Sequence, residues 1–324
     1  MNNIMSKLQR QDLTEEFNCL NTLQHTPWQI NRPVLEIVRQ VWNSGEEWAG
    51  LPARTDRPLI PYPFSKEPQQ MDETERQAFK NWSKKRSETY TFNNKTVSKR
   101  IQIERTLQTA EQYASYDEFY YVWQNDFRSR KYASSTFMSP QSADWSKGLL
   151  TFKRGKAINN WHDARWLCIH GANLYGNDKI TLDQREGWAW DNADEVKRVA
   201  DNPYDNTWWL DADKPWQFLA FCFEWSEMLS ISDHTKHVSR TAVKLDATCS
   251  GLQHYSAMLL DSAGCSATNV GDNDVRNDIY TLAGNETKGL ILDELVTIES
   301  PEEKQWKRSF INCLKDRAIP KQPC

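Results

Sequence analysis

The segment best suited to carry chemistry is Lys244–Ser256, which reads KLDATCSGLQHYS. Within it, Asp246 follows Val238–Leu245, and the β-branched residues of that run predict a strand that ends on the acid. The small residues and Gly251 after the acid let a backbone approach a cation or a phosphate closely. An acid that ends a strand is more often a turn residue or a helix N-cap than a metal ligand, so both interpretations stay open at this point.

Two further segments carry cations in patterns that suit phosphate. In Asp126–Tyr132 (DFRSRKY), three cations surround one acid, and guanidinium groups donate paired hydrogen bonds to phosphate oxygens. Near the last residues of the chain, Arg317 and Lys321 are four positions apart, which places both on one face of a helix. Each pattern taken alone is also typical of a surface turn with salt bridges or of a basic tail.

The elements that must position these residues begin with helices around an extended linker. Apolar residues recur at helical spacing between Val34 and Trp42, which predicts a helix there. Five prolines crowd residues 52–68, and since each fixes φ and lacks an amide donor, we expect an extended linker. A polar helix is expected from about Met71 and a second helix over Ser98–Ala114. Cations on these helices suit either a solvated face or contact with phosphates: Lys80, Lys84, Lys85, Arg86, Lys99, Arg100 and Arg105.

From Phe119 onward, short strands and helices alternate in the prediction. Strands are expected within Tyr120–Phe127, around Tyr132 and over Leu149–Phe152. Residues 160–200 return to helix, and the apolar run Phe218–Trp225 predicts a buried helix. The large apolar side chains that we expect in the core here are Trp161, Trp166, Leu167, Ile169, Trp208 and Trp209.

In their order and surroundings, these segments resemble the bacteriophage-type single-subunit RNA polymerases, a family that includes the mitochondrial enzymes. The resemblance extends over roughly residues 100–324, and fainter similarity reaches back to Thr26–Asn31. Several short sequences in one fixed order carry it: Asp126–Arg130 with Tyr132, Pro140–Gln141, Lys147–Leu150 (KGLL), His170–Asn173 (HGAN) leading to Asp178–Lys179, Asn206–Trp209 (NTWW), Phe218–Glu224 (FLAFCFE) and the Asp246–His254 block.

The resemblance implies an α+β fold, namely the palm of a right-hand polymerase with mostly helical portions of thumb and fingers. Residues 1–50 would form the end of the thumb, and residues 51–100 a proline-rich linker and a basic helix. Residues 101–260 would form the palm with motif A. Residues 261–324 would be the start of the fingers, truncated within motif B.

The same resemblance implies roles for individual residues. Asp246 would be the motif-A carboxylate that holds Mg²⁺, with assistance from the Ala247 carbonyl. Arg317 and Lys321 would hold the incoming ribonucleoside triphosphate, and Lys321 would also donate a proton to the leaving pyrophosphate. The residues expected to contact template or transcript are Arg130, Lys147 and Lys179.

Two positions depart from the family pattern. Ser129 stands where the family usually has glycine, so a turn that needs a positive φ at this position would strain the backbone. Pro320 falls within the expected fingers helix, where it removes a backbone hydrogen bond unless it lies in the first turn. These departures bear on the placement of Arg130 and of the pair Arg317 and Lys321, respectively.

The implied activity is DNA-directed RNA synthesis from ribonucleoside triphosphates on a DNA template, expected in the cytoplasm of a phage-infected bacterium. The second metal carboxylate lies in a later His-Asp pair of the family, and His162–Asp163 does not replace it because that pair precedes motif A. We therefore expect one chain of a split polymerase that a second polypeptide completes. The alternative is an inactive, truncated remnant that at most binds nucleic acid.

Composition and spacing exclude or disfavour several other classes of protein. The 324 residues carry a formal net charge of −4, which disfavours a basic coat for DNA, and no apolar run approaches the ~18 residues of a membrane span. Seven cysteines without a CxxC pair indicate reduced thiols rather than zinc sites or disulfides. A right-hand DNA polymerase is disfavoured because no second acid follows Asp246 closely, and a metal-dependent hydrolase because no acid cluster or His pair accompanies it.

Overall fold

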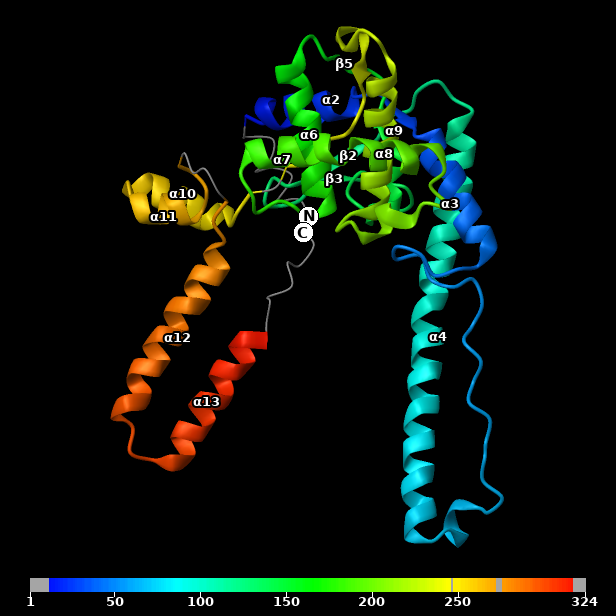
Figure 1. The fold of residues 1–324 in the computed structure, drawn as a ribbon, viewed down its shortest axis with the longest axis vertical. Coiled ribbons are helices and arrows are strands. Elements are labelled where there is room, and N and C mark those ends of the chain that lie inside the picture. The colour runs from blue at the N-terminus through cyan, green and yellow to red at the C-terminus, as the bar shows by residue number, and fades with distance from the viewer. Residues whose placement is uncertain (1–11, 246, 272–275, 317–324) are drawn as a thin grey trace. The chain divides into compact units, whose positions relative to one another are not determined.

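The computed structural model describes residues 12–245, 247–271 and 276–316. These residues divide into two compact units, whose elements Figure 1 colours in chain order. Unit 1 consists of the residues up to 177 together with 186–243, and unit 2 of 178–185 together with the residues from 244 onward. Helix α7 (Leu182–Asp191) begins in unit 2 and ends in unit 1.

Helices dominate both units. The helices of unit 1 are α2 (Thr14–Gln24), α3 (Arg32–Ser44), α4 (Glu73–Ala114), α5 (Asp144–Gly148), α6 (Trp161–Tyr175), α8 (Ala193–Asp201) and α9 (Pro215–Ser230), with 3-10 turns at Pro68–Gln70, Thr207–Asp211 and His234–Lys236. Those of unit 2 are α10 (Ser250–Leu259), α11 (Ser262–Ala267), α12 (Ile279–Thr297) and α13 (Pro301–Asp316).

The strands of the described residues form three small antiparallel pairs in unit 1. They are β1 (Trp28–Ile30) with β4 (Leu150–Phe152), β2 (Trp123–Asn125) with β3 (Lys131–Ala133), and β5 (Lys156–Ala157) with β6 (Val238–Ser239). Large helices with small separate sheets agree with the expected α+β class.

The core of unit 1 surrounds α9. Its sequence is apolar on nearly every side, and Trp216, Phe218, Phe221 and Trp225 are all 0% exposed. Helices α3, α5, α6 and α8 pack against it. A helix that is apolar all round must be covered all round, so α9 organises its neighbours. The buried helix predicted over Phe218–Trp225 is confirmed.

Two glycines let neighbouring segments approach α9 closely. A Cβ atom added to Gly171 of α6 would lie 2.3 Å from Cζ of Phe221. A Cβ atom added to Gly148 would lie 2.8 Å from the carbonyl oxygen of Trp216. The glycines of the HGAN and KGLL sequences are therefore explained by packing.

The prediction that Trp161 and Trp166 lie in the core is wrong, because they are 51% and 56% exposed. Trp161 begins α6, and Trp166 is two residues from both Ala164 and Cys168, which places it about 200° away from the face that they bury. The expected burial of Leu167, Ile169 and Trp209 is confirmed, and Trp208 is partly buried against the same core.

The predicted pair of helices beyond the linker is a single helix, α4, of 42 residues. No proline or glycine interrupts Glu73–Ala114, so the helix continues for about 63 Å. It begins with a capping box in which Asp72 and Glu75 each accept the other's backbone amide. Residue 100, where the region of the linker and basic helix was expected to end, lies inside this helix.

Before the 3-10 turn that begins at Pro68, the proline-rich segment has no regular structure, as predicted, but it is tied to α4. Arg100 of α4 donates hydrogen bonds to the carbonyls of Ala53 (2.8 Å) and Thr55 (2.7 Å). Asn93 makes a reciprocal pair with the backbone of Arg57, at 3.0 and 2.9 Å. Arg86 donates to the carbonyl of Ile60, 2.8 Å away. Two of the expected solvent-facing or phosphate-facing cations, Arg86 and Arg100, are thus structural.

The strand expected over Val238–Leu245 is mostly absent. Only Val238–Ser239 pairs as β6, and residues 240–245 form no regular element. Leu245 is 92% exposed, so the segment before Asp246 is not a buried strand. The partner strand, β5, is likewise two residues long.

Unit 2 differs from unit 1 in its exposed apolar surface. Helix α10 packs on α11, and α12 packs on α13. Yet many large apolar side chains of these helices and their flanks are exposed, among them Met258 (78%), Leu259 (75%), Leu260 (89%) and Val296 (83%). The main cluster of buried apolar residues lies within unit 1. Across the described residues, none of the helices combines the length and apolarity needed to span a membrane.

We expect Gly171→Ala to lower the free energy of unfolding by about 1–3 kcal/mol, because the new methyl group overlaps the Phe221 ring. The matched control is Gly187→Ala in α7, where nothing lies within 4 Å of the added carbon and alanine favours the helix. Urea denaturation followed by tryptophan fluorescence measures both. Equal stabilities of the two variants would contradict the packing assigned to Gly171.

Candidate nucleic-acid interface

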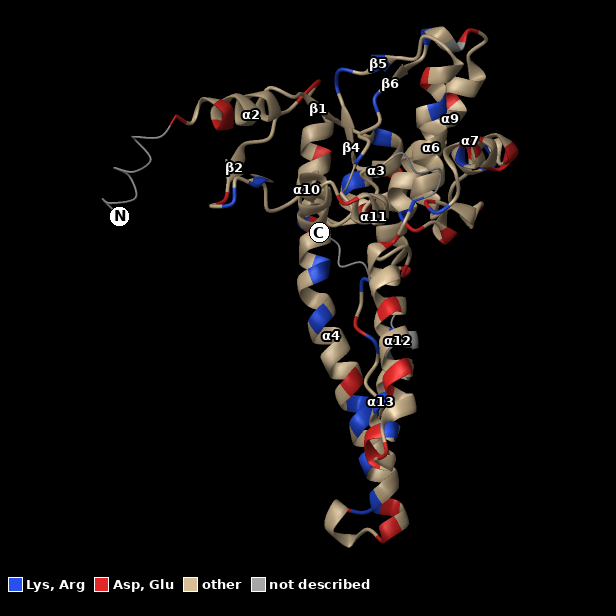
Figure 2. Ribbon diagram, turned by 90° about the vertical axis from the view of Figure 1, so that its left-hand side faces the viewer, with Lys and Arg blue, Asp and Glu red and all other residues tan. Residues whose placement is uncertain are grey.

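The segment Asp126–Arg130 forms the tight turn between β2 and β3 (Figure 2). The Asp126 amide donates to the Arg130 carbonyl at 3.0 Å, and one carboxylate oxygen of Asp126 accepts the amides of Arg128 (2.8 Å) and Arg130 (2.9 Å). Desolvation disfavours the charged carboxylate, but these amides and the two guanidinium charges outweigh it and lower the pKa of Asp126. The acid of the motif therefore folds the turn.

Ser129 has a φ of +58°, the left-handed conformation that favours glycine. The turn does have a positive φ at this position, so the condition under which the sequence analysis expected backbone strain at Ser129 is present. The Ser129 amide still donates to the Asp126 carbonyl at 3.1 Å, so the turn closes despite the substitution.

The side chains at the tip of this turn point outward. Phe127 is 89% exposed, and the guanidinium of Arg128 lies 4.8 Å from the centre of its ring. Arg130 is exposed as well. Exposed arginines beside an exposed aromatic ring are suited to a strand of nucleic acid, because the cations meet phosphates and the ring stacks on a base.

Lys147 lies on the short helix α5 and is half-buried beside Lys214. Burial, and then the charge of Lys214, lower the pKa of Lys147, while Asp144 opposes them in part. The Asp144 carboxylate accepts the Trp216 amide and the Gln217 side chain, both at 2.8 Å, and so caps the first turn of α9. A lysine whose charge is disfavoured by burial and by a second lysine nearby makes this position favourable for an anion.

Lys179 belongs to unit 2 and is exposed near Asp278, the N-cap residue of α12. Burial opposes ionisation of Asp278, but hydrogen bonds from Thr281 and Tyr280, with the charge of Lys179, lower its pKa. The neighbouring Asp178 forms an ion pair with Arg276. The Asp178–Lys179 motif is therefore anchored by its acid while its lysine stays exposed.

The catalytic candidates of the sequence analysis are described only in small part. Asp246, Arg317, Pro320 and Lys321 lie outside the described residues. Ala247 is exposed and belongs to no helix or strand. Within the residues that the structure does describe, no three His, Cys, Asp or Glu side chains are grouped so that they could hold a metal ion.

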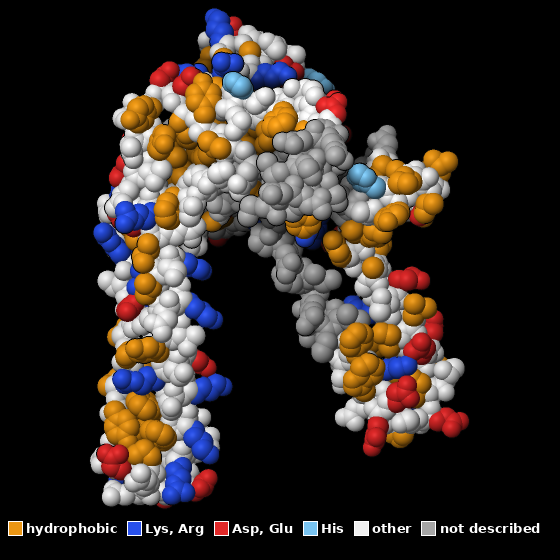
Figure 3. All heavy atoms as spheres, turned by 180° about the vertical axis from the view of Figure 1, so that it is seen from behind, with side chains coloured by type: hydrophobic (Ala, Val, Ile, Leu, Met, Phe, Trp, Pro, Cys, Tyr) orange, Lys and Arg blue, Asp and Glu red, His pale blue; other side chains and the backbone are white. Residues whose placement is uncertain are grey.

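A row of cations follows one side of α4 and is visible along one edge of the helix (Figure 3). At about 100° per residue, its members fall within about a third of the helix circumference. We call these residues the basic stripe, and they are Lys80, Lys84, Lys95, Lys99 and Arg105, all exposed. Between residues 80 and 105, one acidic residue, Glu88, lies on the same side of the helix as these cations. The stripe offers a long, mostly positive surface to a polyanion.

Two structural roles were missed by sequence reasoning. The side-chain amide of Gln141 accepts the Ala133 amide and donates to the Lys131 carbonyl, both at 2.9 Å, so it pairs with the free edge of β3. Asp144, described above, caps α9 from a distant position in the chain. Gln141 belongs to the Pro140–Gln141 sequence and Asp144 precedes the KGLL sequence, but the partners of both residues become adjacent only in the tertiary structure.

Comparison with known proteins identifies the family to which the chain is similar. Residues 159–322 match the family described as DNA-dependent RNA polymerase. The chain is 34% identical over 273 residues to a mitochondrial DNA-directed RNA polymerase of Neurospora crassa, a match covering 84% of this chain and 19% of that protein. It is 33% identical over 285 residues to the DNA-directed RNA polymerase of Enterobacteria phage T3, covering 88% and 31%, respectively. The chain thus spans between about a fifth and a third of these relatives.

Ser129→Gly is expected to raise the free energy of unfolding by up to about 1 kcal/mol, because glycine adopts the left-handed conformation without strain. As a control, Ser87→Gly in the exposed part of α4 should lower it by about 0.5 kcal/mol. Both are measured by urea denaturation. If Ser129→Gly destabilised the protein as much as the control does, the turn would carry no backbone strain.

Proposed function

Because the chain belongs to the phage-type, single-subunit DNA-dependent RNA polymerase family, we propose that it forms part of a DNA-directed RNA polymerase. The reaction would add ribonucleotides from nucleoside triphosphates to the 3′-hydroxyl of an RNA on a DNA template. The observation that carries the proposal is the family match over 159–322, which spans the Asp246 block and the basic residues near the end of the chain.

We propose that the chain works together with further polypeptide that covers unit 2, as one component of a split polymerase. The exposed apolar side chains of α10 and α12 support this, since large exposed apolar patches mark surfaces that bind protein. The alternative proposal is an inactive remnant that at most binds nucleic acid. The phage relatives favour a bacterial cytoplasm, and the mitochondrial relatives favour an organelle.

The roles proposed for single residues follow the family resemblance. Asp246, with the Ala247 carbonyl, would hold Mg²⁺, and Arg317 with Lys321 would hold the triphosphate. When bound, Mg²⁺ would supply Lewis-acid stabilisation of phosphate charge. Cations placed over the triphosphate favour phosphoryl transfer, because the reaction needs positioning and charge stabilisation more than covalent chemistry.

Arg130, Lys147 and Lys179 would contact template or transcript. The exposure of Arg130 on the same turn as the exposed Phe127, and the closeness of Lys147 to Lys214, support phosphate contacts at these residues. We add the basic stripe of α4 as a surface for the phosphate backbone, since its lysines are exposed over several helical turns. In the right-hand architecture, α3 would belong to the end of the thumb, and α5, α6, α8 and α9 to the palm. Helix α4 would cover the basic helix that follows the linker and the start of the palm.

The nucleic-acid proposal predicts a salt-dependent affinity. Lys84→Gln combined with Lys95→Gln should weaken binding of an RNA–DNA hybrid and reduce the slope of log K against log salt by about 1.5, since each lost phosphate contact removes about 0.7–0.9. Fluorescence anisotropy across a salt series measures this slope. The control pair Lys85→Gln and Lys197→Gln removes the same charge from exposed positions outside the stripe and should change the slope by much less.

Primer extension tests the catalytic proposal. We expect no templated incorporation by the chain alone, and incorporation when a polypeptide corresponding to the remaining palm and fingers of the phage relatives is added. Asp246→Ala should abolish the restored synthesis by at least a thousandfold while hybrid binding is retained.

Two outcomes would contradict this proposal. Robust synthesis by the isolated chain would exclude a split active site. If no added polypeptide restored synthesis although the chain still bound the hybrid, the result would favour the alternative proposal of an inactive remnant.

A further inference from the structure

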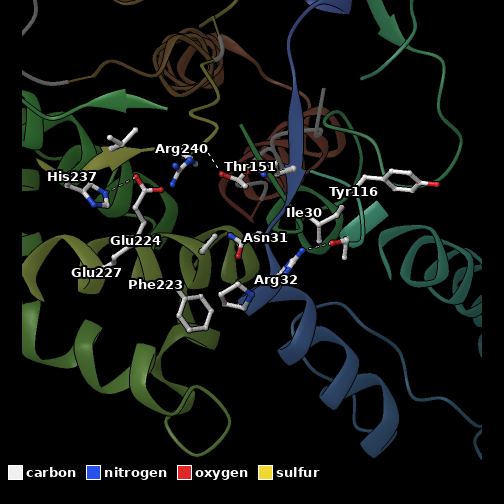
Figure 4. Close-up of a pocket in the computed structure, with 15 residues that line it drawn as sticks. Ile30, Asn31, Arg32, Tyr116, Thr151, Phe223, Glu224, Glu227, His237 and Arg240 are labelled. Carbon is white, nitrogen blue, oxygen red and sulfur yellow. Dashed lines mark hydrogen bonds and ion pairs between the residues drawn. The ribbon is translucent and has the colours of Figure 1, made fainter. Parts of the chain in front are cut away.

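An open pocket of about 340 Å³, lined by polar and apolar residues alike, lies in unit 1 beside α9 and the segment that leads toward Asp246 (Figure 4). Glu224 and Glu227 line it from α9, and His237 and Arg240 line it from the segment. The Glu224 side chain is 13% exposed and the His237 ring 3% exposed. A carboxylate is thus buried where α9 faces this segment.

The Glu224 carboxylate contacts side chains of the segment 237–241. One of its carboxylate oxygens accepts the Thr241 hydroxyl, and the other lies 3.7 Å from Nε2 of His237. Burial opposes the charge on Glu224, but interactions with His237, Ser239 and Thr241 outweigh it and lower its pKa. Thr241 therefore hydrogen-bonds to one oxygen of this carboxylate, and the His237 ring lies near the other oxygen without a hydrogen bond to it.

The opposite side of the same segment is fixed by backbone hydrogen bonds. The Arg240 carbonyl accepts the Phe152 amide at 3.0 Å and the Thr151 hydroxyl at 2.7 Å. The His237 carbonyl accepts the Ile158 amide at 2.9 Å. Residues 237–241 are held from two sides, and after the buried Ala242 the chain becomes exposed.

We propose that Glu224 is a positioning residue of the polymerase: by accepting the Thr241 hydroxyl it fixes the point at which the segment carrying Asp246 leaves the core of unit 1. The inference rests on the proposed function of Asp246 as the metal carboxylate. Thr241 precedes Asp246 by five residues, a reach of at most about 18 Å. A displacement of about 1 Å at a reacting group can lower rates by about a hundredfold, so we expect loss of the anchor that begins this segment to lower the rate of catalysis.

The first test measures local order and needs no catalysis. Thr241→Val removes the hydroxyl that Glu224 accepts while keeping the size of the side chain, and Glu224→Asp draws the carboxylate back by one methylene. We expect both to raise amide hydrogen exchange of peptides covering 237–245 at least tenfold, with exchange in α6 and α8 unchanged. Thr241→Ser, which keeps the hydroxyl, should behave as wild type.

Glu227→Asp is the matched control, because Glu227 lies on the same helix and lines the same cavity but is exposed. It should leave exchange over 237–245 unchanged. Unchanged exchange in Thr241→Val and Glu224→Asp would overturn the inference. So would an increase spread evenly over unit 1, because that would indicate a general loss of stability in place of a local anchor.

The second test uses the complemented primer-extension assay of the proposed function. Thr241→Val should lower kcat about tenfold or more with KM for the nucleotide within about twofold, and Thr241→Ser should restore kcat. Full kcat in Thr241→Val would overturn the positioning role while the polymerase proposal stands. Absence of extension with wild-type protein would count against the proposed function, and the exchange experiment would still decide whether Glu224 anchors the segment.

Discussion

Burial of α9 is the constraint on which the described part of unit 1 depends. Trp216, Phe218, Phe221 and Trp225 leave no exposed surface, and each such side chain contributes about 1.5–3 kcal/mol when it is removed from water. A helix of this kind is stable only where neighbours cover every side. The glycines and the cap that let α5 and α6 approach it are therefore requirements of the core, although they stand inside sequences that resemble polymerase motifs.

Acidic and basic residues of these motifs divide into two roles. Asp126 folds the hairpin turn, Asp144 caps α9, and Asp178 pairs with Arg276, so the acids hold local structure. The cations next to them, Arg130 and Lys179, stay exposed. This division follows from chemistry, because a carboxylate satisfies backbone amides directly, whereas a long cationic side chain keeps its charged end in water. Motif acids then fix where the motif cations are presented.

The two units differ in how they are stabilised. Unit 1 contains the main buried apolar cluster, and even its proline-rich segment is tied along α4 by hydrogen bonds. The described helices of unit 2 pack in pairs and leave residues such as Leu260 and Val296 exposed. Paired helices with little buried apolar surface are marginal by themselves, which fits a unit that is completed by further protein surface.

Sequence alone determined the family, the α+β class, the helix at Val34–Trp42, the extended linker and the buried helix at Phe218–Trp225, because these rest on local periodicity, proline chemistry and the order of short motifs. It also located the position where Ser129 takes a left-handed backbone. Tertiary structure decided which side of α6 is buried and that Arg86 and Arg100 bind the linker backbone. It also decided that Thr241, in the segment before Asp246, bonds to Glu224 where a strand had been expected. The physical reason is that these outcomes depend on partners distant in the chain, and periodicity along a sequence carries no record of which surfaces meet.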